Sequence, residues 1–195
     1  MFKIFFSLSL SFEAPRMLDE RKRTMLLGLA FLFFLLLSSL ENTIFFQILG
    51  VVLQNQLLAV AMLFIHNILV ISLILLGMTF YVNLVLNFFK KDKYERVVLE
   101  HPRIFAIVFT IMIVFLSILR GATLLTGGIV LETLPLVLLI SAPIGIVEGY
   151  GIYLTIKKTL SRTISLKDLI YIYGIFLIAA VMEVGFIELL KTVAT

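Results

Sequence analysis

The stretch MLLGLAFLFFLLLSSL, residues 25–40, carries no charged side chain, and the basic residues Arg21, Lys22 and Arg23 stand directly before it. A helix that crosses the hydrocarbon core of a bilayer needs roughly 20 mainly apolar residues. This stretch is slightly shorter, a difference that flanking residues can accommodate. It therefore predicts a membrane span whose first end is anchored by positive charge.

The composition of the whole chain agrees with a membrane environment. Of 195 residues, 62% are hydrophobic and 14% are charged, and the mean hydropathy is +1.16. A soluble domain of this size needs more polar residues to cover its surface. The net charge of +4 arises from basic residues in short loops, which favours anionic lipid headgroups as the partner and excludes nucleic acid. The chain has no cysteine, so disulfides and thiolate chemistry are excluded.

Further apolar stretches predict an all-α fold, a polytopic transmembrane helix bundle in one membrane domain, residues 1–195. Four more spans are expected at 61–89, 104–119, 134–156 and 169–190. Between the first two spans, Gln47, Gly50 and Gln54 recur on one helix face. This polar stripe favours an outer interfacial or re-entrant helix over residues 43–60. The expected bundle thus has about five spans and one interfacial helix.

The distribution of Lys and Arg predicts the orientation of the chain. With the N-terminus inside, all but Arg120 and Lys191 of the 16 basic residues fall on the inner side. A sixth span over residues 43–60 would move the basic loop at 90–103 outside and destroy this asymmetry. We therefore expect a multi-pass protein of the cell membrane, with its N-terminus cytoplasmic and its C-terminus outside.

The N-terminal segment MFKIFFSLSLSF, residues 1–12, is short and apolar like the core of a signal peptide. The sequence EAPRMLDERKR follows it in place of a small-residue cleavage site. We therefore expect residues 1–23 to be retained as a cytoplasmic or interfacial segment.

Three ionisable residues fall inside the expected spans: His66, Glu148 and Glu183. Depths counted from the expected span ends place Glu148 in the inner half of the membrane and Glu183 in the outer half. His66 should then be able to meet Glu183, whereas Glu148 and Glu183 should not meet. Such residues can form a proton or cation relay, or they can be hydrogen-bonded or neutral groups that hold helices together. The sequence is compatible with both the relay and the structural role.

Small residues surround Glu148 in the segment SAPIGIVEGYG, residues 141–151. Gly145 and Gly149 form a GxxxG pair, which lets a second helix approach closely. Pro143 removes one backbone donor and is expected to bend the span. We therefore predict a helix-packing face that also carries a carboxyl group.

Catalytic signatures are absent from the sequence, which has no HExxH, GxSxG or GxxxxGK[ST] motif. Three scattered ionisable residues do not define a metal site. We therefore expect no enzyme activity, no catalytic residues, no metal and no cofactor.

Three segments resemble the stage II sporulation protein M family: FIHNILVISLILLG (64–77), PIGIVE (143–148) and AAVMEVGFIE (179–188). The second is similar to the family's Pro-His-Gly-x-x-Glu signature, with Ile144 in place of the histidine. The matching positions are Asn67, Gly145, Glu148 and Glu183. The resemblance implies a small polytopic membrane scaffold.

Together these observations predict a non-enzymatic integral membrane scaffold or complex subunit. Its expected partners are the lipid bilayer and either further copies of itself, as a homo-oligomer, or other membrane proteins. The alternative is a small proton- or cation-linked transporter or channel-like protein that uses the buried acids Glu148 and Glu183 together with His66. Asn67 joins these three as a polar candidate for a structural or functional role.

Overall fold

A computed structural model describes residues 20–52, 54–88, 93–126 and 134–194 of the chain. These residues form six helices and no strand, which confirms the all-α prediction. The helices are α2 (Glu20–Val52), α3 (Gln56–Phe88), α4 (Lys93–Glu100), α5 (Pro102–Thr126), α6 (Leu134–Leu160) and α7 (Leu166–Ala194). Most of the expected interfacial segment at 1–23 lies outside the described residues.

Three of these helices are long and apolar enough to cross a membrane. The qualifying segments are Thr24–Glu41 of α2, Gln56–Val85 of α3 and Leu166–Glu188 of α7. A shorter apolar helical segment runs over Pro102–Ile118 of α5. Length and composition therefore support a membrane protein, while the count of five spans remains a prediction.

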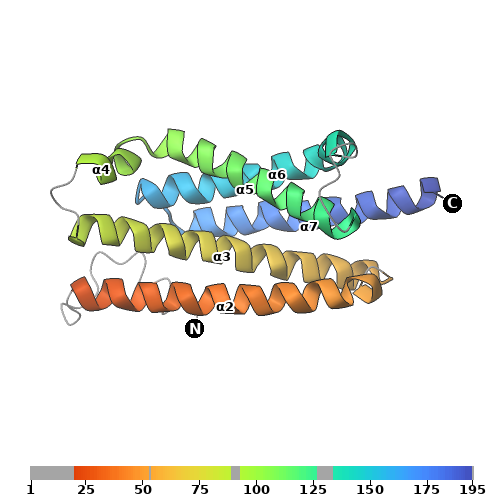
Figure 1. The fold of residues 1–195 in the computed structure, drawn as a ribbon, viewed down its shortest axis with the longest axis horizontal. Coiled ribbons are helices and arrows are strands. Elements are labelled where there is room, and N and C mark those ends of the chain that lie inside the picture. The colour runs from red at the N-terminus through yellow and green to blue at the C-terminus, as the bar shows by residue number, and fades with distance from the viewer. Residues whose placement is uncertain (1–19, 53, 89–92, 127–133, 195) are drawn as a thin grey trace.

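The five long helices lie side by side, and short α4 sits at the end opposite the C-terminus (Figure 1). Helix α3 packs against α2, α6 and α7, and α5 packs mainly against α6. The central core joins side chains of α3, α5, α6 and α7, among them Ile71, Ala106, Ile156, Ile172 and Phe176. Helix α2 packs mainly against α3, so it forms one edge of the bundle.

The expected interfacial helix at 43–60 does not exist as a separate element. Its first part continues α2 as far as Val52, and its last part begins α3 at Gln56. The chain reverses between them, where the Asn55 side-chain oxygen accepts a hydrogen bond from the Leu58 backbone N–H at 3.1 Å. Asn55 thus caps α3. The polar stripe of the sequence therefore marks the approach to a tight reversal, not a helix lying on the membrane.

The two helices of the α2–α3 hairpin are fitted together by reciprocal pairs of glycine and phenylalanine. A Cβ atom built on Gly28 would lie 3.0 Å from the Phe80 ring, and one built on Gly77 would lie 2.9 Å from the Phe31 ring. The two rings stack on each other with centroids 6.5 Å apart. Absent side chains at both glycines therefore make room for the aromatic side chains of the opposite helix.

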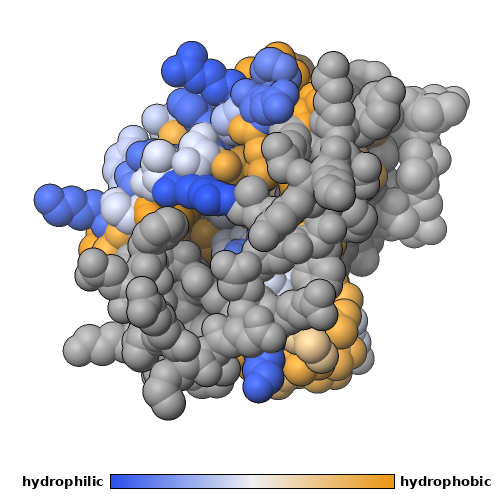
Figure 2. Space-filling model, turned by 90° about the vertical axis from the view of Figure 1, so that its left-hand side faces the viewer, coloured by the Kyte–Doolittle hydropathy of each residue, from blue (hydrophilic) through white to orange (hydrophobic). Residues whose placement is uncertain are grey.

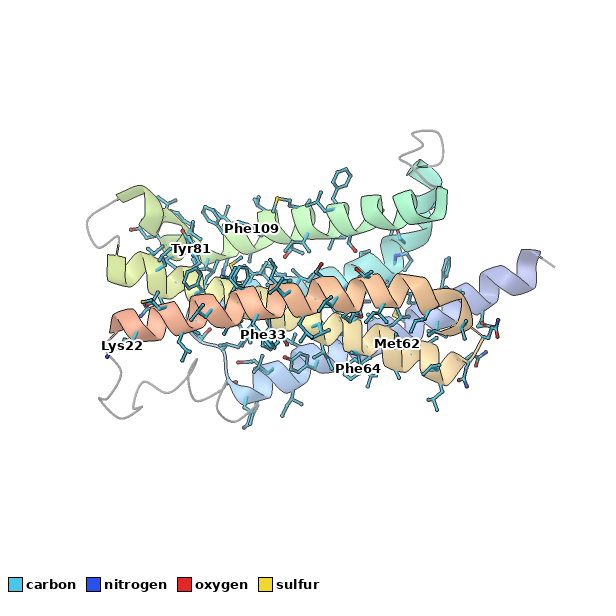
Figure 3. All side chains as sticks on the ribbon, turned by 60° about the horizontal axis from the view of Figure 1, so that its bottom comes forward. Lys22, Phe33, Met62, Phe64, Tyr81 and Phe109 are labelled. Atoms are coloured by element: carbon cyan, nitrogen blue, oxygen red, sulfur yellow. The ribbon has the colours of Figure 1, made fainter. Side chains whose placement is uncertain are left out.

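The same hairpin runs antiparallel along its whole length. Figure 3 shows Lys22 and Tyr81 toward one end of the pair, and Met62 and Phe64 toward the other. Helices α2 and α3 have 33 residues each, which corresponds to about 50 Å. They are therefore longer than the expected spans at 25–40 and 61–89, and they exceed the roughly 30 Å thickness of a hydrocarbon core.

The α6–α7 hairpin uses one glycine in the same way. A Cβ atom built on Gly151 would clash with the ring of Phe176, which is itself only 2% exposed. This contact fixes the register of the two helices, because neither residue has space to move. The expected spans at 104–119, 134–156 and 169–190 fall within α5, α6 and α7, and each helix extends beyond its span.

The turn between α6 and α7 is defined by backbone hydrogen bonds and a cap. Arg162 adopts a left-handed conformation with φ of 55°, and its N–H donates to the carbonyl of Thr159 at 3.0 Å. The N–H of Thr163 donates to the carbonyl of Lys158 at 2.9 Å, which completes a Schellman motif. Ser165 and Asp168 then cap α7 reciprocally.

Candidate functional site

Glu148 of α6 and Glu183 of α7 approach each other closely enough to interact electrostatically. Both side chains are partly buried between the helices. The expectation that these two side chains cannot approach each other does not hold, because the charge of Glu183 acts on the Glu148 carboxyl group. The two carboxyl groups belong to one site.

Helix register explains why these carboxyl groups meet. Because Gly151 faces Phe176, Glu148 lies level with Ala179 of the antiparallel helix. Glu183 is then four residues further along α7, which is about 6 Å. The Cα–Cβ bond of a helical residue tilts toward the helix N-terminus. Because α6 and α7 are antiparallel, the side chain of Glu148 tilts toward the level of Glu183, and that of Glu183 tilts toward the level of Glu148. The two tilts shorten the separation of about 6 Å along the helix axis.

Asn67 of α3 is the third member of this site. Its side chain interacts with the Glu148 carboxyl group, and the residue is only 8% exposed. The side-chain amide nitrogen is fully buried and makes no hydrogen bond of standard geometry. Three helices therefore direct polar side chains to one place, and we call Asn67, Glu148 and Glu183 the carboxyl site.

His66 contributes to a different contact, on the side of α3 that faces α2. Its Nδ1 atom lies 2.9 Å from an Oε2 atom of Glu41. The side chains are 23% and 16% exposed, respectively. The expected depth of His66 in the membrane predicts Glu183 as its partner. In the structure, His66 instead contacts Glu41. Residues 66 and 67 are adjacent in sequence and so point about 100° apart around the helix.

Glu41 is a polar residue that the sequence argument did not single out. It directly follows the stretch at 25–40 and so lies outside the span expected there. Helix α2 instead continues for another eleven residues to Val52. The signal that could have found it is the long Lys- and Arg-free region that follows, because such a region can extend the first helix and carry Glu41 into the bundle.

The GxxxG pair lies against a helix of the same chain. A Cβ atom built on Gly145 or Gly149 would lie 3.4 Å from a methyl group of Val114 on α5. Pro143 is exposed, and α6 continues as a helix on both sides of it. The close-packing face of α6 is therefore used within the chain, so it is no longer evidence for self-association.

Two grooves lie on the described surface, and neither is lined by a carboxyl group of the site. One, of about 310 Å³, lies between α5 and α6 beside Thr110, Val114, Gly145 and Gly149. The other, of about 390 Å³, lies between the outer ends of α3 and α7 and includes Gln56 and Glu188.

The chemistry available at the carboxyl site is that of oxygen ligands and proton acceptors. Two carboxyl groups and one amide can bind a positive charge, and none of the three is a strong nucleophile. Among the described residues, no group of three His, Cys, Asp or Glu side chains is placed to hold a metal ion. The arrangement therefore suits a proton or a small cation better than a transition metal.

No family model matches this chain, and no curated protein and no solved structure matches it significantly. The resemblance to the stage II sporulation protein M family therefore stays a prediction from the quoted segments.

Proposed function

We propose that the chain is a small, non-enzymatic membrane protein of five spans that binds a proton or a small cation within its bundle, as part of a transporter or channel-like activity. The observation that carries this proposal is the convergence of Glu148 and Glu183 with Asn67. Ionisable side chains are expensive inside a membrane, and those that converge there commonly mark an ion pathway.

The position of the carboxyl site along the helices supports a location inside the membrane. Asn67 lies within the apolar segment Gln56–Val85, and Glu183 lies within the apolar segment Leu166–Glu188. Both segments are longer than a single crossing needs, so the site is flanked by apolar turns on either side. Glu148 reaches the same level from α6.

The proposed orientation follows from charge at the two ends of the bundle. Lys22 begins α2, Arg103 begins α5, and the basic side chains Lys157, Lys158 and Arg162 end α6. These residues share the end at which α4 lies, and Figure 2 shows hydrophilic side chains among the coloured residues of this end. We place this end in the cytoplasm.

A second candidate function is the scaffold or complex subunit. The observation that favours it is α2, which packs mainly against α3 and leaves large apolar side chains exposed, including Leu29 at 63% and Leu36 at 65%. Lipid or another membrane protein can cover such a face. The GxxxG pair adds little to this candidate, because both glycines contact Val114 of α5 in the same chain.

Reconstitution into liposomes tests the ion proposal. Purified protein would be placed in vesicles that contain a pH-sensitive dye, and proton or cation flux would be driven by an imposed gradient. We expect flux in the native protein and a loss of at least tenfold in Glu148→Gln and in Glu183→Gln. Glu188→Gln is the matched control, because Glu188 lies on α7 outside the carboxyl site.

Flux that is equal in all four proteins, or no greater than in empty vesicles, would contradict the ion proposal. Isolation of the protein from native membranes in a stable complex, together with absent flux, would favour the scaffold instead.

A further inference from the structure

The turn between α6 and α7 carries an excess of positive charge. It contains one acid, Asp168, and four basic side chains: Lys157, Lys158, Arg162 and Lys167. The acid is already engaged, because the Lys158 Nζ atom lies 2.7 Å from the Asp168 Oδ1 atom. The other three basic side chains therefore add positive charge that no acid of this turn neutralises.

Two of these basic side chains lie on one outward face of the hairpin. The contact between Lys158 and Asp168 shows which sides of α6 and α7 face each other. Lys157 and Lys167 each precede one partner of this contact, so each is turned by about 100° from it. Because the helices are antiparallel, both turns lead to the same side of the hairpin. This side points away from α3, since the core residue Ile172 lies on the other side of α7.

Tyrosine side chains continue this face away from the turn. Tyr150 and Tyr153 precede Lys157 by seven and four residues, and Tyr171 follows Lys167 by four. Such spacings keep side chains on one face of a helix, and Tyr150 and Tyr171 are exposed. The Lys157 Nζ atom lies 5.4 Å from the centroid of the Tyr153 ring, a cation–π contact that orients this lysine. The tyrosines thus lie about 6 to 10 Å further along the hairpin than the lysines.

Beyond the tyrosines the same face is aliphatic. Ile146 precedes Tyr150 by four residues, Ile178 follows Tyr171 by seven, and both isoleucines are exposed. The order along the hairpin is therefore basic, then aromatic with a hydroxyl group, then aliphatic. A phospholipid has the same order in its phosphate, its glycerol esters and its acyl chains. The headgroup region is about 5 to 8 Å thick on each side of the hydrocarbon core, and tyrosine is enriched at their boundary.

We propose that this outward face of the α6–α7 hairpin binds one anionic phospholipid, with its phosphate between Lys157 and Lys167 and its acyl chains along Ile146 and Ile178. The inference rests on the proposed membrane location of the chain and not on the ion. Basic clusters at the end of membrane helices attract anionic headgroups. The lysines alone would also suit a free phosphate ion, but the tyrosines and isoleucines that continue the face fit the rest of a lipid.

Thermal unfolding of the full chain in uncharged detergent tests this inference. The midpoint would be measured while phosphatidylglycerol or phosphatidylcholine is added at equal mole fractions. A ligand that binds only the folded state raises the midpoint, and the rise gives an apparent dissociation constant. We expect a saturable rise with the anionic lipid, little rise with the zwitterionic lipid, and none with inorganic phosphate at the same concentration.

Variants locate the effect on the hairpin. Lys157→Gln and Lys167→Gln should each weaken the apparent affinity for phosphatidylglycerol about fivefold, and the double variant about 30-fold, as expected for one basic side chain each near an anionic headgroup. Lys22→Gln is the matched control. It removes one charge at the same end of the bundle, but from α2, which packs mainly against α3. It should keep the native affinity.

Equal rises with the two lipids would overturn the inference, as would a rise that inorganic phosphate reproduces. If Lys22→Gln weakened the affinity as much as the double variant, the net charge of this end of the bundle would attract the lipid, and the α6–α7 face would not be a site. None of these measurements involves flux, so their failure leaves the ion proposal standing. Confirmed lipid binding together with absent flux would instead remove the ion proposal alone.

Discussion

The α2–α3 and α6–α7 hairpins share two features, glycine–phenylalanine contacts and a pair of polar side chains, but these lie at different distances from the turn. Each fits phenylalanine rings against glycine, at Gly28 and Gly77 in the first and at Gly151 in the second. Each also has one contact between polar side chains: His66 Nδ1 lies 2.9 Å from Glu41 Oε2 in the first, and Lys158 forms an ion pair with Asp168 at the turn of the second. The hairpins differ in how far the polar pair lies from the turn that joins the two helices.

At the α6–α7 turn the ion pair is partly exposed, and Asp168 also caps α7 together with Ser165, so the pair serves mainly to begin α7. In the α2–α3 hairpin the pair lies far from the turn, in a part of the helices where apolar residues dominate. Between apolar helices such a pair can hold α2 to α3 by a hydrogen bond, because there is no hydrophobic driving force between helices in lipid. The polar groups at the α6–α7 turn therefore define where α7 begins. Glu41 and His66, which lie away from a turn, instead connect α2 to α3.

The largest expected effect comes from removing one member of the pair of Glu41 and His66. His66→Leu leaves the partly buried Glu41 carboxyl group without its partner, and its Oε1 atom already lacks one. We expect a loss of about 3 kcal/mol of stability, measured by thermal unfolding in detergent. The double variant Glu41→Leu/His66→Leu should recover most of this loss, because both polar groups are then gone. A double variant no more stable than His66→Leu would contradict the pairing.

Gly151→Ala should have the next largest effect. Its new methyl group would clash with the buried Phe176 ring, so the hairpin must separate at a cost of about 2 kcal/mol. Gly174→Ala is the matched control on α7, because no atom lies within 4 Å of the added carbon. We expect the control to be neutral or slightly stabilising. Phe176→Leu should restore part of the stability of Gly151→Ala, and the absence of any rescue would argue against the contact.

A smaller effect is expected at the turn. Asp168→Ala removes hydrogen bonds to the backbone N–H and hydroxyl group of Ser165 as well as the ion pair with Lys158. We expect a loss of about 1 kcal/mol, mainly from the cap. Lys158→Ala removes only a solvent-accessible ion pair and should cost less than half as much. Equal losses in the two variants would show that the ion pair, not the cap, holds the turn.

Among the variants other than the Gly174→Ala control, the smallest change, and a stabilising one, is expected for Arg162→Gly. Arg162 has φ of 55° at the end of α6, a conformation that glycine adopts without a steric cost. We expect a gain of about 0.5 kcal/mol in the same unfolding measurement. A loss of stability would mean that a contact of the Arg162 side chain outweighs the steric cost of its left-handed conformation.

Sequence reasoning predicted the long apolar helices, because an uncharged stretch such as residues 25–40 can satisfy its backbone hydrogen bonds in lipid only as a helix. It misplaced the region at 43–60, since a polar stripe on one face looks the same in an interfacial helix and in the last turns before a reversal. The cap by Asn55 decides between these two structures, and it becomes evident only when α3 is seen to fold back on α2.

The polar candidates show a different limit. His66, Asn67, Glu148 and Glu183 could be recognised by their chemistry, but their partners could not. Depth counted from estimated span ends separated Glu148 from Glu183, whereas their distance is set by the contact of Gly151 with Phe176 and by the opposite tilts of two side chains. The alignment of one helix against another depends on packing between them. The hydropathy of a single helix gives no information about this alignment.

The most direct test of the account is the proximity of residues 148 and 183. Because the chain has no cysteine, Glu148→Cys/Glu183→Cys introduces the only two thiols, and a short bifunctional thiol reagent can join them in native membranes. Trypsin then cleaves at the exposed Arg162, between the two positions. We predict that the α6 and α7 fragments remain covalently linked, and that they separate in the control Glu148→Cys/Glu188→Cys. Fragments that separate equally in both variants would contradict a shared carboxyl site.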